Sequence, residues 1–278
     1  MSQTIRLGIS TCPNDTFAFH GLLTRSVDWR GIRFEVELLD IEQLNERLLG
    51  DTLDVGKTSF HAALHLADDY VVLPSGSALG FGVGPLLLSA AAGTRPQTTA
   101  QVTLCPGRLT TAALLFALFH PQTTRVEHAL FSEIMPKLEA GEADFGVCIH
   151  EGRFTWQRRG LGCVEDLGTR WEQETGHPLP LGGIVASNRL PRDTIATVQQ
   201  VIHDSLRFAL ADRRAALPTM RRYAQEFDDD VLMQHVDLYV NQWTVDLGSE
   251  GARALSELSV RAASIGLGIG KQLRIFSQ

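Results

Sequence analysis

Residues 53–73, LDVGKTSFHAALHLADDYVVL, contain a complete strand–helix–strand unit. The apolar strand at 53–56 passes through Lys57, Thr58 and Ser59 into a helical stretch at 60–67, and a second apolar strand follows at 70–73. Strands that alternate with helices at such short spacing are typical of a mostly parallel sheet covered by helices. This stretch therefore predicts an α/β fold.

The same alternation continues on both sides of this unit. Upstream, two strands and two helices are expected at residues 5–10, 33–39, 16–23 and 41–49. Downstream, a second series of strands and helices is expected at residues 101–105, 109–119, 126–131, 134–140 and 143–149. From residue 193 the pattern becomes almost wholly helical. Two such series and a helical C-terminal part predict two α/β lobes.

Two further strands, at residues 85–90 and 182–187, are expected to carry the chain between the lobes. Lobe one is then discontinuous, with residues 1–90 plus 186–278, and lobe two is the inserted segment 91–185. The C-terminal helices are expected to pack back onto lobe one. The glycines at 80, 82 and 84 lead into a strand and lack the sixth-position glycine of a dinucleotide loop, so they indicate a hinge or a tight turn.

Composition excludes several classes of protein. Hydrophobic residues make up 44% of the 278 residues and charged residues 21%, values that exclude a disordered chain. With 25 basic and 32 acidic residues the net charge is −7, and no basic stripe points to a nucleic-acid partner. Neither a secretory signal nor an apolar run long enough for a membrane span is visible. The scattered cysteines, at 12, 105, 148 and 163, favour a cytoplasmic protein with reduced thiols.

Ligands of α/β sheets bind beyond the carboxyl ends of the strands, where helices begin. This rule selects the loops at residues 11–15, 57–59, 107–111 and 150–154. Thr110 and Thr111 open a strong helix whose N–H groups favour a carboxylate or phosphate, although an ordinary capping threonine is the simpler interpretation. Lys57 adds a positive charge at a second helix start, and a surface lysine beside a capping residue explains it equally well.

His150 follows an apolar strand and precedes Glu151 and Arg153. In a cleft its imidazole is well placed as a general base, whereas a histidine bonded to backbone at a strand end is the simpler interpretation for an isolated one. Cys148 could pair with it as a nucleophile or metal ligand, but no third and fourth ligand follow at sensible spacing, so no metal is predicted. Cys12, beside a helix start, is a minor nucleophile candidate. The other eight histidines are predicted to be structural.

Six blocks of the sequence resemble, in order, the signature of the 1,4-dihydroxy-6-naphthoate synthases, which act in the futalosine route to menaquinone. The blocks are STCPNDTF (10–17), DVGKTSF (54–60), SGSALG (75–80) with GPL (84–86), PGRLTTA (106–112), IHEGRFTW (149–156) and PLPLGG (178–183). The departures are Thr11 in place of the usual proline, Gly56 where serine is common and Trp156 in place of tyrosine.

This resemblance implies a type 2 periplasmic-binding-protein-like fold with two crossover strands. It implies a carbon–carbon lyase that converts cyclic dehypoxanthine futalosine, a small-molecule carboxylate, into 1,4-dihydroxy-6-naphthoate and a three-carbon fragment. His150 carries over as the general base, and the substrate contacts carry over as Lys57, Thr58, Ser59, Thr111 and Ala112. No cofactor is implied. Two alternatives stay open, a non-enzymatic solute-binding protein of the same fold and the sibling chorismate dehydratase, which lacks the H-E-G-R-F block.

Overall fold

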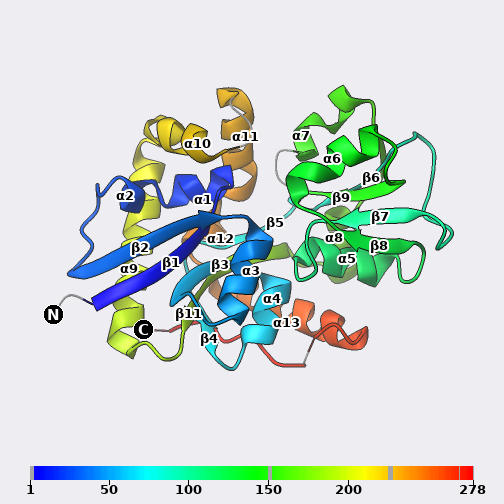
Figure 1. The fold of residues 1–278 in the computed structure, drawn as a ribbon. Helices are drawn as coiled ribbons and strands as arrows, with labels where there is room; N and C mark the ends of the chain where they lie inside the picture. The colour runs from blue at the N-terminus through cyan, green and yellow to red at the C-terminus, as the bar shows by residue number, and fades with distance from the viewer. Residues whose placement is uncertain (1–2, 150–151, 225–227, 269, 278) are drawn as a thin grey trace.

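The computed structural model describes residues 3–149, 152–224, 228–268 and 270–277, which form two α/β lobes (Figure 1). The sheet of the first lobe has the strand order β2-β1-β3-β11-β4, with β5 also paired to β11. Its strands are β1 (Gln3–Ser10), β2 (Ile32–Leu39), β3 (Val55–Ser59), β4 (Tyr70–Val72), β5 (Ala78–Gly80) and β11 (Leu179–Ser187). Strand β1 is parallel to β2 and β3, as the alternating pattern predicts. Strand β11 returns antiparallel to β3, β4 and β5.

The second lobe has its own sheet, with the strand order β10-β6-β9-β7-β8. Its strands are β6 (Leu86–Ser89), β7 (Val102–Cys105), β8 (Arg125–His128), β9 (Phe145–Cys148) and β10 (Gly162–Asp166). Strand β7 is parallel to β8 and β9, while β6 is antiparallel to β9 and β10. The two-lobed α/β fold expected from the sequence is therefore confirmed.

The lobe boundaries differ from those expected at residues 90 and 185. Strand β6 bonds to β9 and β10 and so belongs wholly to the second sheet, whereas β11 bonds within the first. The chain therefore crosses just before each of these strands, at residues 81–85 and 176–178. A hydrophobic pattern marks where a strand lies but not which ladder it joins, because pairing depends on residues far away in the sequence.

The glycine-rich crossing forms a close backbone contact and not a nucleotide loop. Gly82 has a φ of +70°, a conformation that glycine adopts without strain. A side chain at Gly84 would lie 2.1 Å from the Cα of Gly168, so the two backbones touch at this point. Arg153 donates to the carbonyl of Gly84 and pairs with Asp166, 2.6 Å away in each case. These contacts hold the crossing segment against the second lobe.

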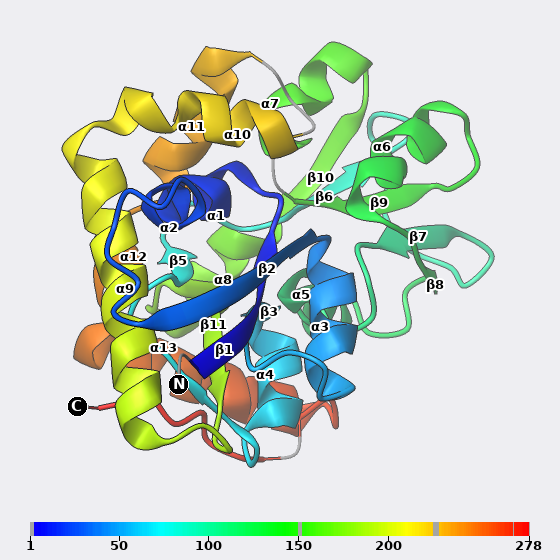
Figure 2. The same ribbon diagram turned by 60° about the vertical axis from the view of Figure 1, so that its left-hand side comes forward.

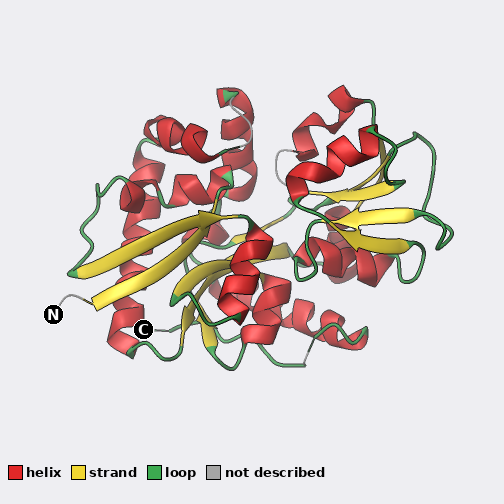
Figure 3. Ribbon diagram, viewed as in Figure 1, coloured by secondary structure: helices red, strands yellow, loops and turns green. Residues whose placement is uncertain are grey.

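Helices cover both sheets (Figure 3). Those that follow the first strands are α1 (Pro13–Ala18), α2 (His20–Leu23), α3 (Ile41–Leu49) and α4 (Phe60–Leu66), and those of the second lobe are α5 (Thr111–Phe119), α6 (Phe131–Glu139), α7 (Gly152–Thr155) and α8 (Leu167–Thr175). The C-terminal helices are α9 (Arg192–Ala211), α10 (Leu217–Tyr223), α11 (Asp229–Tyr239), α12 (Gln242–Val245) and α13 (Gly248–Ser264), and the 3-10 turns are η1 (Trp156–Arg159) and η2 (Arg213–Ala216).

The C-terminal helices return to the first lobe. Helix α9 packs on α1 and α2 and runs alongside that lobe (Figure 2), and α13 packs on α4 and β11. Near the end of the chain, Ile275 forms a parallel bridge with Val72 of β4. None of the helices in the described part of the chain is both long and apolar enough to cross a membrane.

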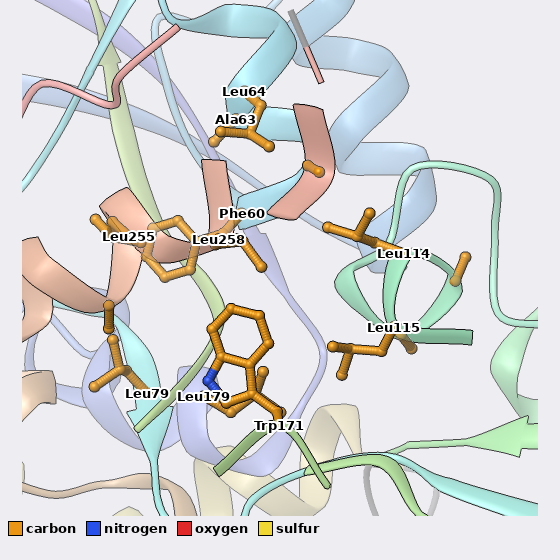
Figure 4. Packing of buried hydrophobic residues seen from close by; sticks show 14 of the residues in the cluster. Phe60, Ala63, Leu64, Leu79, Leu114, Leu115, Trp171, Leu179, Leu255 and Leu258 are labelled. Carbon is orange, nitrogen blue, oxygen red and sulfur yellow. The ribbon is translucent and has the colours of Figure 1, made fainter. Parts of the chain in front are cut away.

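One apolar core is shared by the two lobes. Trp171 of α8 is fully buried and lies among Phe60, Leu115, Leu179 and Leu258 (Figure 4). These side chains come from both lobes and from the C-terminal helix α13. Burial of such a continuous set of apolar side chains stabilises the packing of one lobe on the other. The shared core therefore holds α4 and α5 next to each other at the junction of the two lobes.

Candidate active site

A cavity lies where the two lobes meet. It opens at the carboxyl ends of β1 and β3 and at the amino end of α5, the position expected for a ligand site in an α/β protein. Its walls are formed by Ser10, Cys12, Asn14, Asp15, Ile41, Lys57, Ser59, Ala78, Val83, Pro85, Thr110, Thr111, Ala112, Ile149, Leu181, Gly182, His235 and Tyr239. Two segments far apart in the sequence, at 57–59 and 110–112, therefore meet in one cavity.

Most of the residues selected from the sequence line this cavity. Lys57, Ser59, Thr111 and Ala112 do so. Thr58 is buried behind the wall, where its hydroxyl donates to the side-chain oxygen of Asn45 at 3.0 Å. His150 and Glu151 lie outside the described residues. Ile149, which precedes His150 in the chain, lines the cavity.

The ammonium group of Lys57 is bound by a carboxylate. Its Nζ atom lies 2.6 Å from Oδ1 of Asp15 and 3.0 Å from the carbonyl oxygen of Gly76. The other carboxylate oxygen of Asp15 accepts from the hydroxyl of Ser10, and Oδ1 also accepts from the Asn14 side chain. The side chains of Lys57 and Asp15 are only 5% and 3% exposed. Lys57 is thus not the exposed lysine of the alternative interpretation, and its charge is already balanced at the cavity wall.

Helix α3 supports both sides of the cavity. The side-chain oxygen of Asn45 accepts from the backbone N–H of Ser59, and its amide group donates to the hydroxyl of Ser59 and to Glu42. The other oxygen of Glu42 accepts from the backbone N–H groups of Arg108 at 2.6 Å and Leu109 at 3.2 Å, in the second lobe. One helix of the first lobe therefore positions the loop that leads into α5.

The two threonines at the beginning of α5 have different roles: Thr110 caps the helix, and Thr111 ties it to the first lobe. Thr110 is the N-cap and accepts from the backbone N–H of Ala113. Thr111 donates to the carbonyl oxygen of Leu181 at 2.7 Å and so ties α5 to β11 of the first lobe. The N–H groups of Thr111 and Ala112 belong to the first turn of the helix, where no carbonyl of the same helix accepts them. The helix dipole favours a negatively charged group at this end.

Replacing Glu42 with alanine should raise KM for the substrate about tenfold and change kcat less. The carboxylate accepts two backbone N–H groups of the loop before α5, and a charge-assisted hydrogen bond contributes about 1.5–3 kcal/mol. Steady-state kinetics check this expectation. Glu46→Ala, at an exposed position on the same helix, is the matched control and should behave as the unchanged chain. Equal KM values for the two variants would contradict the role of Glu42.

The cysteines differ in their surroundings. Burial raises the pKa of the Cys148 thiol to about 12, so this thiol is not available as the nucleophile considered for it, because the thiolate is the reactive form. The pKa of Cys105 is also raised to about 12 by burial. Cys12 lies in the cavity wall at the N-cap of α1. Of the two nucleophile candidates from the sequence, only Cys12 is well placed.

Several side chains at the cavity are not apparent from the sequence. Asp15 lies in a loop selected as a ligand loop, but its pairing with Lys57 joins residues 42 positions apart. His235 and Tyr239 lie one helical turn apart on the buried face of α11 and also line the cavity. The prediction that all histidines besides His150 are structural therefore overlooked His235. A polar pair inside an otherwise apolar helix face is the signal that could have identified it.

Comparison with known proteins identifies the family of the chain. The family model described as menaquinone biosynthesis matches residues 5–264. Two curated relatives, both named 1,4-dihydroxy-6-naphtoate synthase, are similar over nearly their whole length. The relative from Thermus thermophilus is 41% identical over 265 residues (95% of this chain and 96% of the relative), and that from Streptomyces coelicolor is 38% identical over 273 residues (96% and 95%).

Solved structures show the same fold. Protein AF1704 from Archaeoglobus fulgidus superposes with a TM-score of 0.90 at 28% identity and covers 95% of this chain and 98% of its own. The alkanesulfonate-binding protein SsuA from Xanthomonas axonopodis pv. citri, bound to MOPS, superposes with a TM-score of 0.74 at 12% identity and covers 98% of both chains. The second likeness concerns the fold alone, and it confirms a periplasmic-binding-protein-like architecture.

Proposed function

The chain belongs to the menaquinone biosynthesis family, and from this membership we propose that it is a carbon–carbon lyase of menaquinone biosynthesis. It converts cyclic dehypoxanthine futalosine into 1,4-dihydroxy-6-naphthoate with release of a three-carbon fragment. The observation that carries the proposal is the near full-length similarity to two 1,4-dihydroxy-6-naphthoate synthases, at 41% and 38% identity.

The substrate carboxylate binds where two helices begin. Ser59 is the N-cap of α4 and Thr111 opens α5, and both residues line the cavity. Their positions support an anion site because both helix starts border the cavity, and the amino end of a helix favours a negatively charged group. Lys57 contributes a positive charge that Asp15 already balances. The carboxylate is therefore held mainly by the helix starts, with Lys57 and Ser59 completing the wall.

His150 acts as the general base. Because it follows Ile149 directly in the chain and Ile149 lines the cavity, the family role of this histidine agrees with the site. Removal of a proton from the substrate allows the carbon–carbon bond to break, and formation of the aromatic ring drives the reaction forward. The apolar part of the wall, with Ile41, Val83 and Leu181, suits the ring system and limits the access of water. The reaction proceeds in the cytoplasm, in keeping with the scattered cysteines.

Offering each candidate substrate to the purified chain tests the proposal. Cyclic dehypoxanthine futalosine should give the absorption of the naphthoate and a three-carbon product, without an added cofactor. Chorismate should give no product, and turnover of chorismate instead would identify the sibling dehydratase. Binding of cyclic dehypoxanthine futalosine with no product would identify a solute-binding protein. Either of these two results would overturn the proposed function.

A further inference from the structure

His235 lies in the wall of the same cavity as Lys57 and Thr111. It is contributed by α11, from the C-terminal part of the chain, and its side chain is almost fully buried. The apolar residues Val231, Leu232 and Val236 of the same helix are also buried. A histidine at such a position is enclosed by protein on one side and faces the cavity on the other.

Ring contacts place the imidazole at the lobe junction. Its centroid is 4.4 Å from that of Tyr239 on the same helix and 6.4 Å from that of Phe154 in α7 of the second lobe. Helices α11 and α7 lie at the same end of the two lobes and face each other (Figures 1 and 2). Phe154 follows His150 by only four residues in the chain. The ring of His235 therefore packs against α7 of the second lobe.

The proposed reaction needs an acid as well as a base. When the base removes a proton from the substrate, the carbon–carbon bond breaks and its electron pair passes to the departing three-carbon fragment. That fragment must gain a proton before it leaves as a neutral product. A positioned donor typically accelerates such a step about 10²–10⁴-fold. The cavity should therefore contain a second proton-transfer group.

Among the described residues, the ionisable side chains in the cavity wall are Cys12, Asp15, Lys57, His235 and Tyr239. Asp15 and Lys57 are bonded to each other and to neighbouring groups. Of the other side-chain types, an imidazole ordinarily titrates near 6.5, a thiol near about 8.5 and a phenol near about 10. The best acid near neutral pH is the group that titrates closest to it, which is the imidazole.

We propose that His235 is a second catalytic histidine, which donates a proton to the three-carbon fragment as the carbon–carbon bond breaks. The inference rests on the proposed function and on His150 as the base. The imidazolium of His235 transfers one proton to the fragment and becomes neutral, while the base retains the proton taken from the substrate. Water restores both groups once the products have left. Protons and electrons balance without an oxidant or a cofactor.

Kinetics of His235→Gln test the proposal. We expect kcat to fall about 10²–10⁴-fold, with KM changed less than about threefold, since the proton is transferred only in the transition state. In His235→Ala, added imidazole should restore part of the activity, while pyrazole, of the same shape but a far poorer acid–base group, should not. His20→Gln is the matched control: His20 is also buried but contacts Thr219 and Phe208 outside the cavity, and its loss should leave kcat unchanged.

Further variants distinguish a catalytic role of His235 from a purely structural one. If His235→Gln does not fold, His235→Phe retains an aromatic ring against Tyr239 and Phe154, and the same loss of kcat is expected in it. A kcat within about threefold of the unchanged chain, or equal rescue by pyrazole and imidazole, would show that the ring only fills space. If the unchanged chain forms no naphthoate, the proposed function fails and the role of His235 fails with it, whereas naphthoate formation by the unchanged chain with an undiminished kcat in His235→Gln overturns the role of His235 alone.

Discussion

Replacing His150 with alanine should lower kcat about 10²–10⁴-fold while much of the substrate binding is kept. A general base acts on a proton in the transition state and contributes little to the affinity for the bound substrate. The rate of naphthoate formation by the unchanged chain should also show a limb near the ordinary histidine pKa of roughly 6.5, at which the base loses its proton. Steady-state kinetics over a range of pH measure both effects.

His128→Ala is the matched control for this change. His128 ends β8 in the same lobe and is exposed, so its loss should leave both kcat and KM as they are. If His150→Ala kept the kcat of the unchanged chain, His150 would be structural, and the base would have to be sought at Cys12 or Glu151. A large increase in KM at constant kcat would instead make His150 a binding residue.

Breaking the buried ion pair between Lys57 and Asp15 should lower the free energy of unfolding by about 3–5 kcal/mol. Either Lys57→Met or Asp15→Leu leaves one charge in a wall that is almost inaccessible to water, and a buried charge without its partner is costly. The double variant removes both charges and should be markedly more stable than either single variant. Chemical denaturation measures the three values.

A surface pair provides the control. Lys137 and Glu133 lie four residues apart on α6 and are 37% and 47% exposed, so Lys137→Met should change the free energy of unfolding by only about 0.3–0.5 kcal/mol. If Lys57→Met cost no more than this, the pair would have no structural role.

Lys57→Ala should also raise KM at least as much as it lowers kcat if the ammonium group touches the substrate carboxylate.

The fold was predictable because its signal is local. The segment at 53–73 shows strand and helix periodicity within one short stretch, and the structure has β3, α4 and β4 there. The lobe boundaries were harder to predict from the sequence, because the hydrogen bonds of β6 to β9 and β10 decide the sheet to which β6 belongs. Those partners lie tens of residues further along the chain, and no pattern within residues 85–90 reveals them.

The site could be predicted where it depends on the ends of strands. Thr111 and Ala112 open α5, whereas Lys57 and Ser59 lie within β3, which runs through Ser59 where the sequence pattern predicted a loop; all four line the cavity. The roles of other residues at the site depend on tertiary contacts, which the sequence alone does not reveal. Glu42 is an unremarkable acidic residue of an amphipathic helix until the fold brings it to Arg108 of the other lobe.

The complex of the His150→Gln variant with cyclic dehypoxanthine futalosine tests the account most directly. A crystal structure should show the substrate between the lobes, with its carboxylate within about 3.2 Å of the N–H groups of Thr111 or Ala112, or of the hydroxyl of Ser59. The reacting carbons should face residue 150, and Lys57 should remain bonded to Asp15. A substrate bound outside this cavity, or one whose carboxylate points to solvent, would contradict the account.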